Sequence, residues 1–186
     1  MRYHLANVLD EERTCYADGI FPDGEIAEVI EFGITVVDLS ARAIVDTHSI
    51  AVVPTLSQVS DYCTNLTGWT YDKLLGCGVD FKEACRLLVD QFDSLNRLLV
   101  IDSVSDIIAL ENQCAVMKQP MPFGPHRLNI STLFSLLTDR RKQVGSEKLM
   151  RLLGLESEPV RHRADSDSRG TARAFLSVLE KGAFKA

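Results

Sequence analysis

The stretch EIAEVIEFGITVVDLSARAIVDTHSIAVV, residues 25–53, contains two runs rich in isoleucine and valine, Glu25–Leu39 and Ala43–Val53. β-Branched residues favour strands; a turn signal separates the two runs, and Pro54 ends the second. Toward the N-terminus, Tyr3–Leu9 is a shorter, mostly apolar run, and turn formers fill the loop that follows it. Three sequential strands with short connections predict an antiparallel meander.

Beyond Pro54 the sequence favours helices, with one further strand. Apolar residues recur at helical spacing after Asp80, a residue type that commonly caps a helix. Leu98–Ile101 is a short apolar run typical of a buried strand. The expected helices are Val59–Leu66, Tyr71–Leu75, Phe81–Leu95, Asp106–Met117, Ile130–Leu137, Ser146–Leu153 and Thr171–Lys181. This order predicts one α/β domain over residues 1–186, with a mixed central sheet, antiparallel in its first three strands, flanked by helices.

The composition narrows the classes of protein that fit. The longest apolar runs are too short to cross a bilayer and the N-terminus lacks the apolar region of a signal peptide, so we expect no membrane partner. Five cysteines without a Cys-x-x-Cys pair favour reduced thiols in the cytoplasm. The net charge of −6 argues only weakly against nucleic-acid binding, because an enzyme that collects carboxylates for metal ions places negative charge in its active site.

Four short segments contain acidic residues or a histidine where chemistry could use them. They are Asp10-x-Glu12 after the first strand, Glu31 in the second, Asp106 at the start of a helix, and His162-x4-Asp167 in a polar loop before the last helix. Each has an ordinary interpretation: an exposed acidic turn, a strand with one solvated face, a helix cap or a solvated loop. Side chains two apart on a strand share a face, however, so both carboxylates of the first segment could point at one site.

Together and in this order, the segments suit metal-dependent phosphodiester hydrolysis. Two divalent cations about 4 Å apart need several carboxylates brought together from separate elements. Hard oxygen ligands select Mg²⁺ or Mn²⁺ rather than zinc. A histidine is suited to accept a proton from an attacking water near neutral pH. The carboxylates would come from Asp10, Glu12, Asp106 and Asp167, and the base would be His162.

Longer motifs around these residues resemble the DEDDh 3′→5′ exonucleases, and especially their Eri-type branch. That branch typically opens with Asp-Phe-Glu-Ala-Thr-Cys, and here the segment is Asp10-Glu11-Glu12-Arg13-Thr14-Cys15. Further elements follow in the family's order: Val29-Ile30-Glu31-Phe32-Gly33, Tyr62-Cys63-Thr64-Asn65-Leu66-Thr67-Gly68-Trp69-Thr70, Asp106 with Leu110-Glu111-Asn112-Gln113-Cys114, and His162-x4-Asp167. The resemblance spans nearly the whole chain.

The resemblance implies a fold, a reaction and a set of site residues. The fold would be ribonuclease H-like. The reaction would be a two-metal-ion 3′→5′ exonuclease reaction that hydrolyses phosphodiester bonds at single-stranded 3′ ends of RNA or DNA and releases nucleoside 5′-monophosphates. Two Mg²⁺ or Mn²⁺ ions would be bound by Asp10, Glu12, Asp106 and Asp167, with His162 activating the water. The substrate would be bound by Arg13, Thr14, Leu66, Thr67, Trp69 and Arg163.

Glu11 and Arg13 depart from the family pattern, which has an apolar and a small residue beside the first metal ligands. Extra charge there could alter substrate approach, or pair with Glu12 and weaken metal binding. The alternative from a different class is therefore a catalytically weakened nucleic-acid-binding or interaction module of the same fold. A metal-dependent phosphodiesterase of another polarity is a third hypothesis. We expect no accessory nucleic-acid-binding domain in 186 residues, so longer substrates would require a partner or a homodimer.

Overall fold

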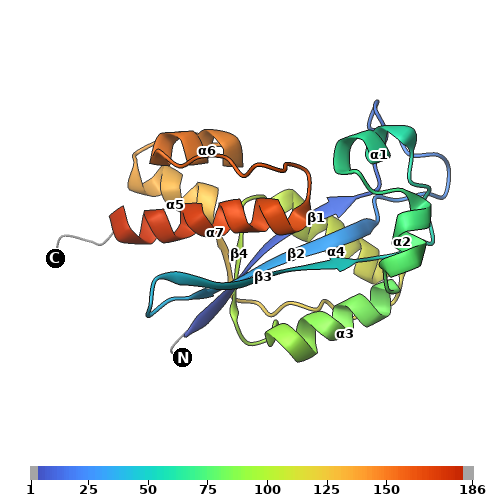
Figure 1. Cartoon of the computed structure of the whole chain (residues 1–186), viewed down its shortest axis with the longest axis horizontal. Helices are drawn as coiled ribbons and strands as arrows, with labels where there is room; N and C mark the ends of the chain where they lie inside the picture. The colour runs from blue at the N-terminus through green and yellow to red at the C-terminus, as the bar shows by residue number, and fades with distance from the viewer. Residues whose placement is uncertain (1–3, 182–186) are drawn as a thin grey trace.

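The computed structural model of the protein describes residues 4–181 and contains a five-stranded mixed sheet (Figure 1). The strands are β1 (Leu5–Arg13), β2 (Val29–Asp38), β3 (Ala43–Ala51), β4 (Leu98–Ile101) and β5 (Arg127–Asn129). Their order across the sheet is β3-β2-β1-β4-β5. The first three strands pair antiparallel, whereas β4 is parallel to β1 and β5 to β4. The predicted mixed sheet with antiparallel first three strands is confirmed.

Helices cover both faces of this sheet (Figure 1). They are α1 (Asp61–Thr67), α2 (Tyr71–Cys77), α3 (Phe81–Phe92), α4 (Val104–Val116), α5 (Ile130–Leu137), α6 (Ser146–Leu153) and α7 (Ala164–Lys181). On one face α7 crosses β1, β2 and β3, with α5 and α6 packed beside it. On the other face α3 and α4 supply the apolar side chains that cover the sheet. None of the helices within residues 4–181 has the length and apolar character needed to cross a membrane.

β1 continues through the acidic segment, whereas the sequence predicts a strand that ends at Leu9. Pairing with β2 extends it as far as Glu12, which lies opposite Glu31, and a bulge follows. Backbone hydrogen bonding to β2 compensates for the low strand propensity of these charged residues. The first residue of the predicted strand, Tyr3, lies outside the described residues. Asp10 and Glu12 therefore belong to the strand itself.

Two helix starts also differ from the prediction. α7 begins at Ala164 and not at Thr171, so Asp167 lies in its first turn instead of in the preceding loop. The first two turns of α7 are mostly polar, so apolar spacing does not indicate a helix there. The cap of α4 is Ser103, so Asp106 lies in the first turn and is not the cap. β5 lies where the sequence indicates no strand, because three residues are too few to show an alternating pattern.

Apolar clusters on the two faces of the sheet make up most of the core. One lies between the sheet and helices α3 and α4, around Phe32, Leu88 and Leu110. The other lies between the sheet and helices α5 to α7, around Ile130 and Phe175. Each fully buried side chain of this kind contributes about 2 kcal/mol to stability. The clusters fix α4 and α7 against opposite faces of the sheet, and each of these helices carries a predicted metal ligand.

β1 and β2 turn a matched set of residues toward α7. Residues directly opposite each other in an antiparallel pair point to the same face of the sheet. The register places Asp10 opposite Gly33 and Glu12 opposite Glu31. The acidic positions of β1 and the start of α7 therefore meet at one end of the sheet.

Gly33 allows the first turn of α7 to lie directly on β2. A methyl group at this position would overlap the backbone carbonyl of Ala164 and the backbone nitrogen of Asp165. Further along the strand, the hydroxyl groups of Thr35 and Ser168 hydrogen bond to each other at 2.9 Å, buried between strand and helix. This close approach brings the segment that precedes α7 to the acidic end of β1.

Gly33→Ala should destabilise the fold by more than about 3 kcal/mol, because the added methyl group fits only if α7 moves away from β2. The matched control is Gly76→Ala in α2. A Cβ there meets nothing within 4 Å, and alanine favours a helix interior over glycine by about 0.5–1 kcal/mol. Urea unfolding of both variants measures the difference. Equal stability of the two variants would contradict the packing of α7 on Gly33.

Candidate metal and catalytic site

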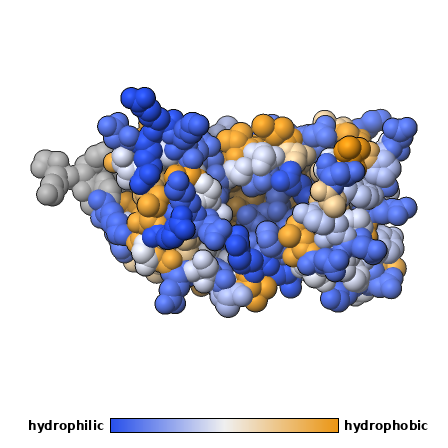
Figure 2. All heavy atoms as spheres, turned by 90° about the horizontal axis from the view of Figure 1, so that it is seen from above, coloured by the Kyte–Doolittle hydropathy of each residue, from blue (hydrophilic) through white to orange (hydrophobic). Residues whose placement is uncertain are grey.

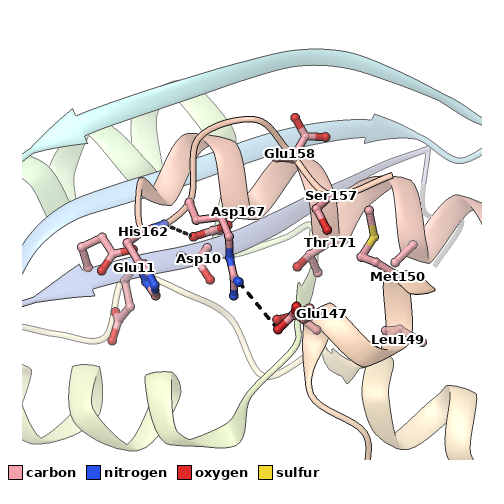
Figure 3. A pocket seen from close by; sticks show the side chains of 15 residues that line it. Asp10, Glu11, Glu147, Leu149, Met150, Ser157, Glu158, His162, Asp167 and Thr171 are labelled. Atoms are coloured by element: carbon pink, nitrogen blue, oxygen red, sulfur yellow. Dashed lines mark hydrogen bonds and ion pairs between the residues drawn. The ribbon is translucent and has the colours of Figure 1, made fainter. Parts of the chain in front are cut away.

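A cavity of about 270 Å³ lies where the acidic end of β1 meets the start of α7. Four of the five predicted catalytic residues are among those that line it: Asp10, Glu12, His162 and Asp167. Figure 3 shows Asp10, His162 and Asp167 pointing toward one another, across the cavity from Leu149 of α6. Figure 2 shows a hydrophilic hollow in the surface between the part that carries α6 and the part that carries α1. The cavity thus brings together residues from the two ends of the sequence.

The carboxylates in this cavity are held where their neutral forms are favoured. Burial, followed by the charges of Glu12 and Asp167, raises the pKa of Asp10 well above its usual range. Burial and the charge of Asp167 raise the pKa of Glu12 to about 8. Burial also raises the pKa of Asp167. A cluster of this kind favours an added cation, because positive charge removes the mutual repulsion of the ionised groups.

His162 is held in place by the aspartate of its own motif. Its backbone φ is +56°, in the left-handed region that few residues other than glycine adopt. The backbone N–H of His162 donates to Oδ2 of Asp167 at 2.9 Å, and the backbone N–H of Asp167 donates to the carbonyl of Arg163. These bonds close a tight turn beside the acidic end of β1. Asp167 therefore fixes the turn and also contributes charge to the cavity.

The side chains present fit a divalent cation. One ligand atom each from Glu12, His162 and Asp167 lie within 4.8 Å of one another. Carboxylate oxygens suit Mg²⁺, and Mn²⁺ accepts imidazole nitrogen in addition. Asp10 contributes another carboxylate to the same cavity. The donor set therefore agrees with the predicted metal chemistry.

Asp106 lies apart from the other predicted metal ligands. It is not among the residues that line the cavity, although its charge contributes, after burial and the nearer carboxylates, to the raised pKa of Asp10. Its Oδ1 accepts a hydrogen bond from Nη2 of Arg13 at 3.1 Å. Burial raises the pKa of Asp106, and the guanidinium of Arg13 partly offsets this effect. Arg13, a predicted substrate-binding residue, thus contacts a predicted metal ligand.

Glu31 is completely buried and forms the centre of a hydrogen-bond network. The guanidinium of Arg163 donates to both of its carboxylate oxygens, and Nε1 of Trp69 donates to Oε2 at 2.9 Å. The backbone N–H of Ala164 and the hydroxyl of Ser49 also donate to Glu31. Burial works against ionisation of this carboxyl, but the donors outweigh it and lower its pKa. The sequence assigns Glu31 no role of its own; its signals are a carboxylate in an apolar strand and its place in the family-like segment Val29-Ile30-Glu31-Phe32-Gly33.

None of the predicted substrate-binding residues is among the described residues that line the cavity. The guanidinium of Arg163 stacks over the ring of Trp69, 4.7 Å from its centre, and both donate to the buried carboxylate of β2. The hydroxyl groups of Thr14 and Thr67 are bonded to backbone atoms of the chain itself. Leu66 is half-buried near the end of α1. A role for these residues in substrate binding remains a prediction.

The cavity also contains charged residues that the motifs do not identify. Glu147 of α6 forms an ion pair with Arg161 at 3.6 Å, which joins α6 to the segment before α7 (Figure 3). Glu158 pairs with both Arg169 and Arg173 of α7. Their sequence signal is weak, because helices and loops commonly carry such charges on a solvated face.

Comparison with known families gives a match over most of the chain. Residues 8–175 match the family model RNase_T, described as exonuclease. Among curated proteins, the chain is similar to human 3′-5′ exoribonuclease 1, with 26% identity over 192 residues. That match covers 97% of this chain and 54% of the human protein, so the chain spans about half the length of this relative.

Solved structures share the same fold. The nuclease domain of 3′hExo, described as a DEDDh family member bound to rAMP, matches with a TM-score of 0.85 and 25% identity, covering 97% of this chain and 94% of that one. A structure described as 3′-end specific recognition of histone mRNA stem-loop by 3′-exonuclease matches with a TM-score of 0.86 and 25% identity, covering 97% and 65%. The predicted ribonuclease H-like fold is thereby confirmed.

Mg²⁺ should stabilise the protein increasingly as the pH rises toward 8. The pKa of Glu12 is about 8 in the fold against an ordinary value of 4.5. The stability that protonated Glu12 preserves at low pH is therefore lost progressively as the pH rises from about 4.5 to about 8, and a cation that neutralises the ionised carboxylate restores it. Thermal unfolding with and without Mg²⁺, from about pH 5 to about pH 9, measures the effect. Glu12→Gln should flatten the pH dependence; a Mg²⁺ effect independent of pH in the wild type would contradict this account.

Glu31→Gln should destabilise the fold by about 3 kcal/mol and also weaken Mn²⁺ binding, because it leaves buried donors mispaired at the base of the His162 segment. Glu28→Gln is the matched control. Glu28 is equally buried, and its carboxylate accepts backbone N–H groups of residues 55–57, which do not line the cavity. It should lose stability while keeping its Mn²⁺ affinity. Calorimetric Mn²⁺ titration below both melting temperatures separates the variants, and an equal loss of affinity would refute the anchoring role.

Proposed function

Because the chain belongs to the RNase_T exonuclease family, we propose that it is a metal-dependent 3′→5′ exonuclease. The reaction hydrolyses phosphodiester bonds at single-stranded 3′ ends of RNA or DNA and releases nucleoside 5′-monophosphates. The observation that carries the proposal is the meeting of two carboxylates of β1 with His162 and Asp167 in one cavity. Residues from opposite ends of the sequence supply the metal ligands and the base that this reaction needs.

In this proposal three carboxylates of the cavity and that of Asp106, which lies outside the cavity lining, hold two Mg²⁺ or Mn²⁺ ions. Asp10, Glu12 and Asp167 approach from β1 and α7, and Asp106 completes the set from the first turn of α4. The bound cations supply Lewis-acid stabilisation of negative charge on the scissile phosphate. The raised pKa values of these four carboxyl groups support the proposal, since each group gains from a positive charge placed among them.

His162 acts as the general base and accepts a proton from the attacking water. A positioned base contributes about 10²–10⁴-fold to a reaction of this kind. The left-handed turn and the hydrogen bond to Asp167 fix the backbone of His162, and the next residue, Arg163, is hydrogen bonded to Glu31. The imidazole is also close enough to Glu12 for the two side chains to bind the same cation. We assign it the role of base because carboxylates alone satisfy Mg²⁺.

RNA 3′ ends are the substrate that we favour, with single-stranded DNA second. The curated relative is named 3′-5′ exoribonuclease 1, and the structural neighbours are described with rAMP and with a histone mRNA stem-loop. Those substrates belong to these proteins. Because the chain covers 54% of the human relative, the choice of substrate by the remaining part of that protein does not transfer to this chain.

A second candidate function is supported by one specific observation. The ion pair between Arg13 and Asp106 places a protein cation on a predicted metal ligand. If this ion pair prevented a divalent metal ion from binding at Asp106, the protein would be a catalytically weakened nucleic-acid-binding or interaction module of the same fold. Retention of RNA binding with no metal-dependent cleavage would favour this alternative over the exonuclease.

The setting and assembly of the protein are part of the proposal. We place it in the cytoplasm because its five cysteines are free thiols, as expected of a reducing compartment. For substrates longer than the cavity can hold, a homodimer or another partner would bind the part of the strand outside the cavity.

The test uses single-stranded RNA and DNA oligonucleotides of matched sequence, labelled at either the 5′ or the 3′ end and incubated with Mg²⁺, Mn²⁺ or a chelator. A 3′→5′ exonuclease releases the 3′ label first as a mononucleotide and shortens the 5′-labelled strand stepwise. A 3′-terminal phosphate should slow the reaction sharply. Shortening from the 5′ end, or cleavage that persists in the chelator, would overturn the proposal.

Asp10→Asn and His162→Ala should each lower kcat by about 100-fold or more, because they remove a metal ligand and the base. The matched controls are Asp46→Asn and His48→Ala on β3, whose side chains pair with each other and do not line the cavity. They make the same chemical changes and should leave kcat within about twofold of the wild type. Activity equal to the wild type in His162→Ala would exclude His162 as the base.

A further inference from the structure

Arg13 lies between two carboxylates. Its Nε is 3.3 Å from Oε1 of Glu11, and its Nη2 is 3.1 Å from Oδ1 of Asp106. The side chain of Glu11 has no exposed surface, that of Asp106 is 15% exposed and that of Arg13 is 25% exposed. One guanidinium therefore joins a fully buried acid to an acid that we assign to the metal site.

Glu11 ties Arg13 to this position. It points from β1 toward α4, on the same face of the sheet as Leu9, where Ile107 and Leu110 of α4 cover the strand. Both of its carboxylate oxygens are buried without a hydrogen-bond partner among residues 4–181. Arg13 is the one cation paired with it in this part of the chain. Moving the guanidinium away would leave both buried carboxylate oxygens of Glu11 without any polar partner, which is unfavourable.

Asp106 shares its cation with Glu11 and has little other support. Within residues 4–181, its other polar contact is with the hydroxyl of Ser105 in the same turn. A carboxylate that is already paired with a guanidinium attracts a divalent cation less strongly, because the two cations repel each other. Glu12, His162 and Asp167, by contrast, have no arginine or lysine within ion-pair distance among the described residues.

We propose that Arg13 is a built-in cation at Asp106 that makes the two divalent cation positions unequal. The resting protein binds one cation tightly through the cavity carboxylates, and it fills the position that needs Asp106 only weakly while Arg13 holds that carboxylate. Arg13 is a positioning residue in this account, and Glu11 is the group that anchors it. This inference rests on the proposed metal-dependent function and names the chain's own determinant of metal stoichiometry.

The experiment is calorimetric titration of the full chain with Mn²⁺ in the absence of nucleic acid. The wild type should show one tight site and a second site weaker by about tenfold or more, and Arg13→Ala should tighten the second site by about tenfold. Arg127→Ala is the matched control, because Arg127 pairs with Glu111 on the same helix as Asp106 but on an exposed surface. It removes the same charge and should leave both sites unchanged.

A second variant guards against misfolding. Arg13→Ala leaves the buried Glu11 without a counter-charge, whereas Glu11→Met with Arg13→Ala replaces the pair by apolar side chains of suitable size for that core. The double variant should fold at least as stably as the wild type and bind the second Mn²⁺ as tightly as Arg13→Ala does. Electron paramagnetic resonance of bound Mn²⁺ counts the ions independently of any nuclease activity.

The possible outcomes distinguish a failure of this inference from a failure of the proposed metal-dependent function. Two sites of equal affinity in the wild type, or a second site that is unchanged or weaker in both Arg13 variants, would overturn the inference and leave the exonuclease standing. Absence of Mn²⁺ binding in the wild type and in both variants would overturn the metal-dependent function and the inference together. Tightening of the second site in both variants, but not in Arg127→Ala, supports it.

Discussion

A carboxylate with no exposed surface, that of Glu31, accepts hydrogen bonds from three separate parts of the chain. They come from Ser49 on β3, from Trp69 between α1 and α2, and from Arg163 and Ala164 at the start of α7. Glu31 pairs across the strands with Glu12, so the network lies directly beside the cavity. Removing Glu31 would release the segment that carries His162, and the site would lose its geometry before it lost any ligand.

Some acidic residues of this region form ion pairs with arginines, and others do not. Glu31 is neutralised by Arg163, Glu158 by Arg169 and Arg173, and Asp106 by Arg13. No ion pair of this kind reaches Asp10, Glu12 or Asp167 in the described part of the chain, and their pKa values are raised. Ionising these buried carboxyl groups costs free energy unless a cation lies beside them. The cavity therefore favours cation binding, which the net charge of −6 for the whole chain does not indicate.

The sequence predicts the parts of the site that depend on local periodicity, and misses those that depend on distant contacts. The period of two along β1 correctly places Asp10 and Glu12 on one face, and the motif His162-x4-Asp167 supplies their partners. The early start of α7 is hidden because it is stabilised by packing on Gly33, far away in the sequence. The pairing of Arg13 with Asp106 spans 93 residues, and no pattern along the chain indicates it.

Glu11 and Arg13 are the two departures from the resembled family beside the predicted metal ligands, and they contact each other. An acid at position 11 alone would be buried without compensation, and an arginine at position 13 alone would have only Asp106 to hold it. Each residue therefore explains the presence of the other. Because Arg13 also contacts Asp106, a single guanidinium connects the core between β1 and α4 to a predicted metal ligand.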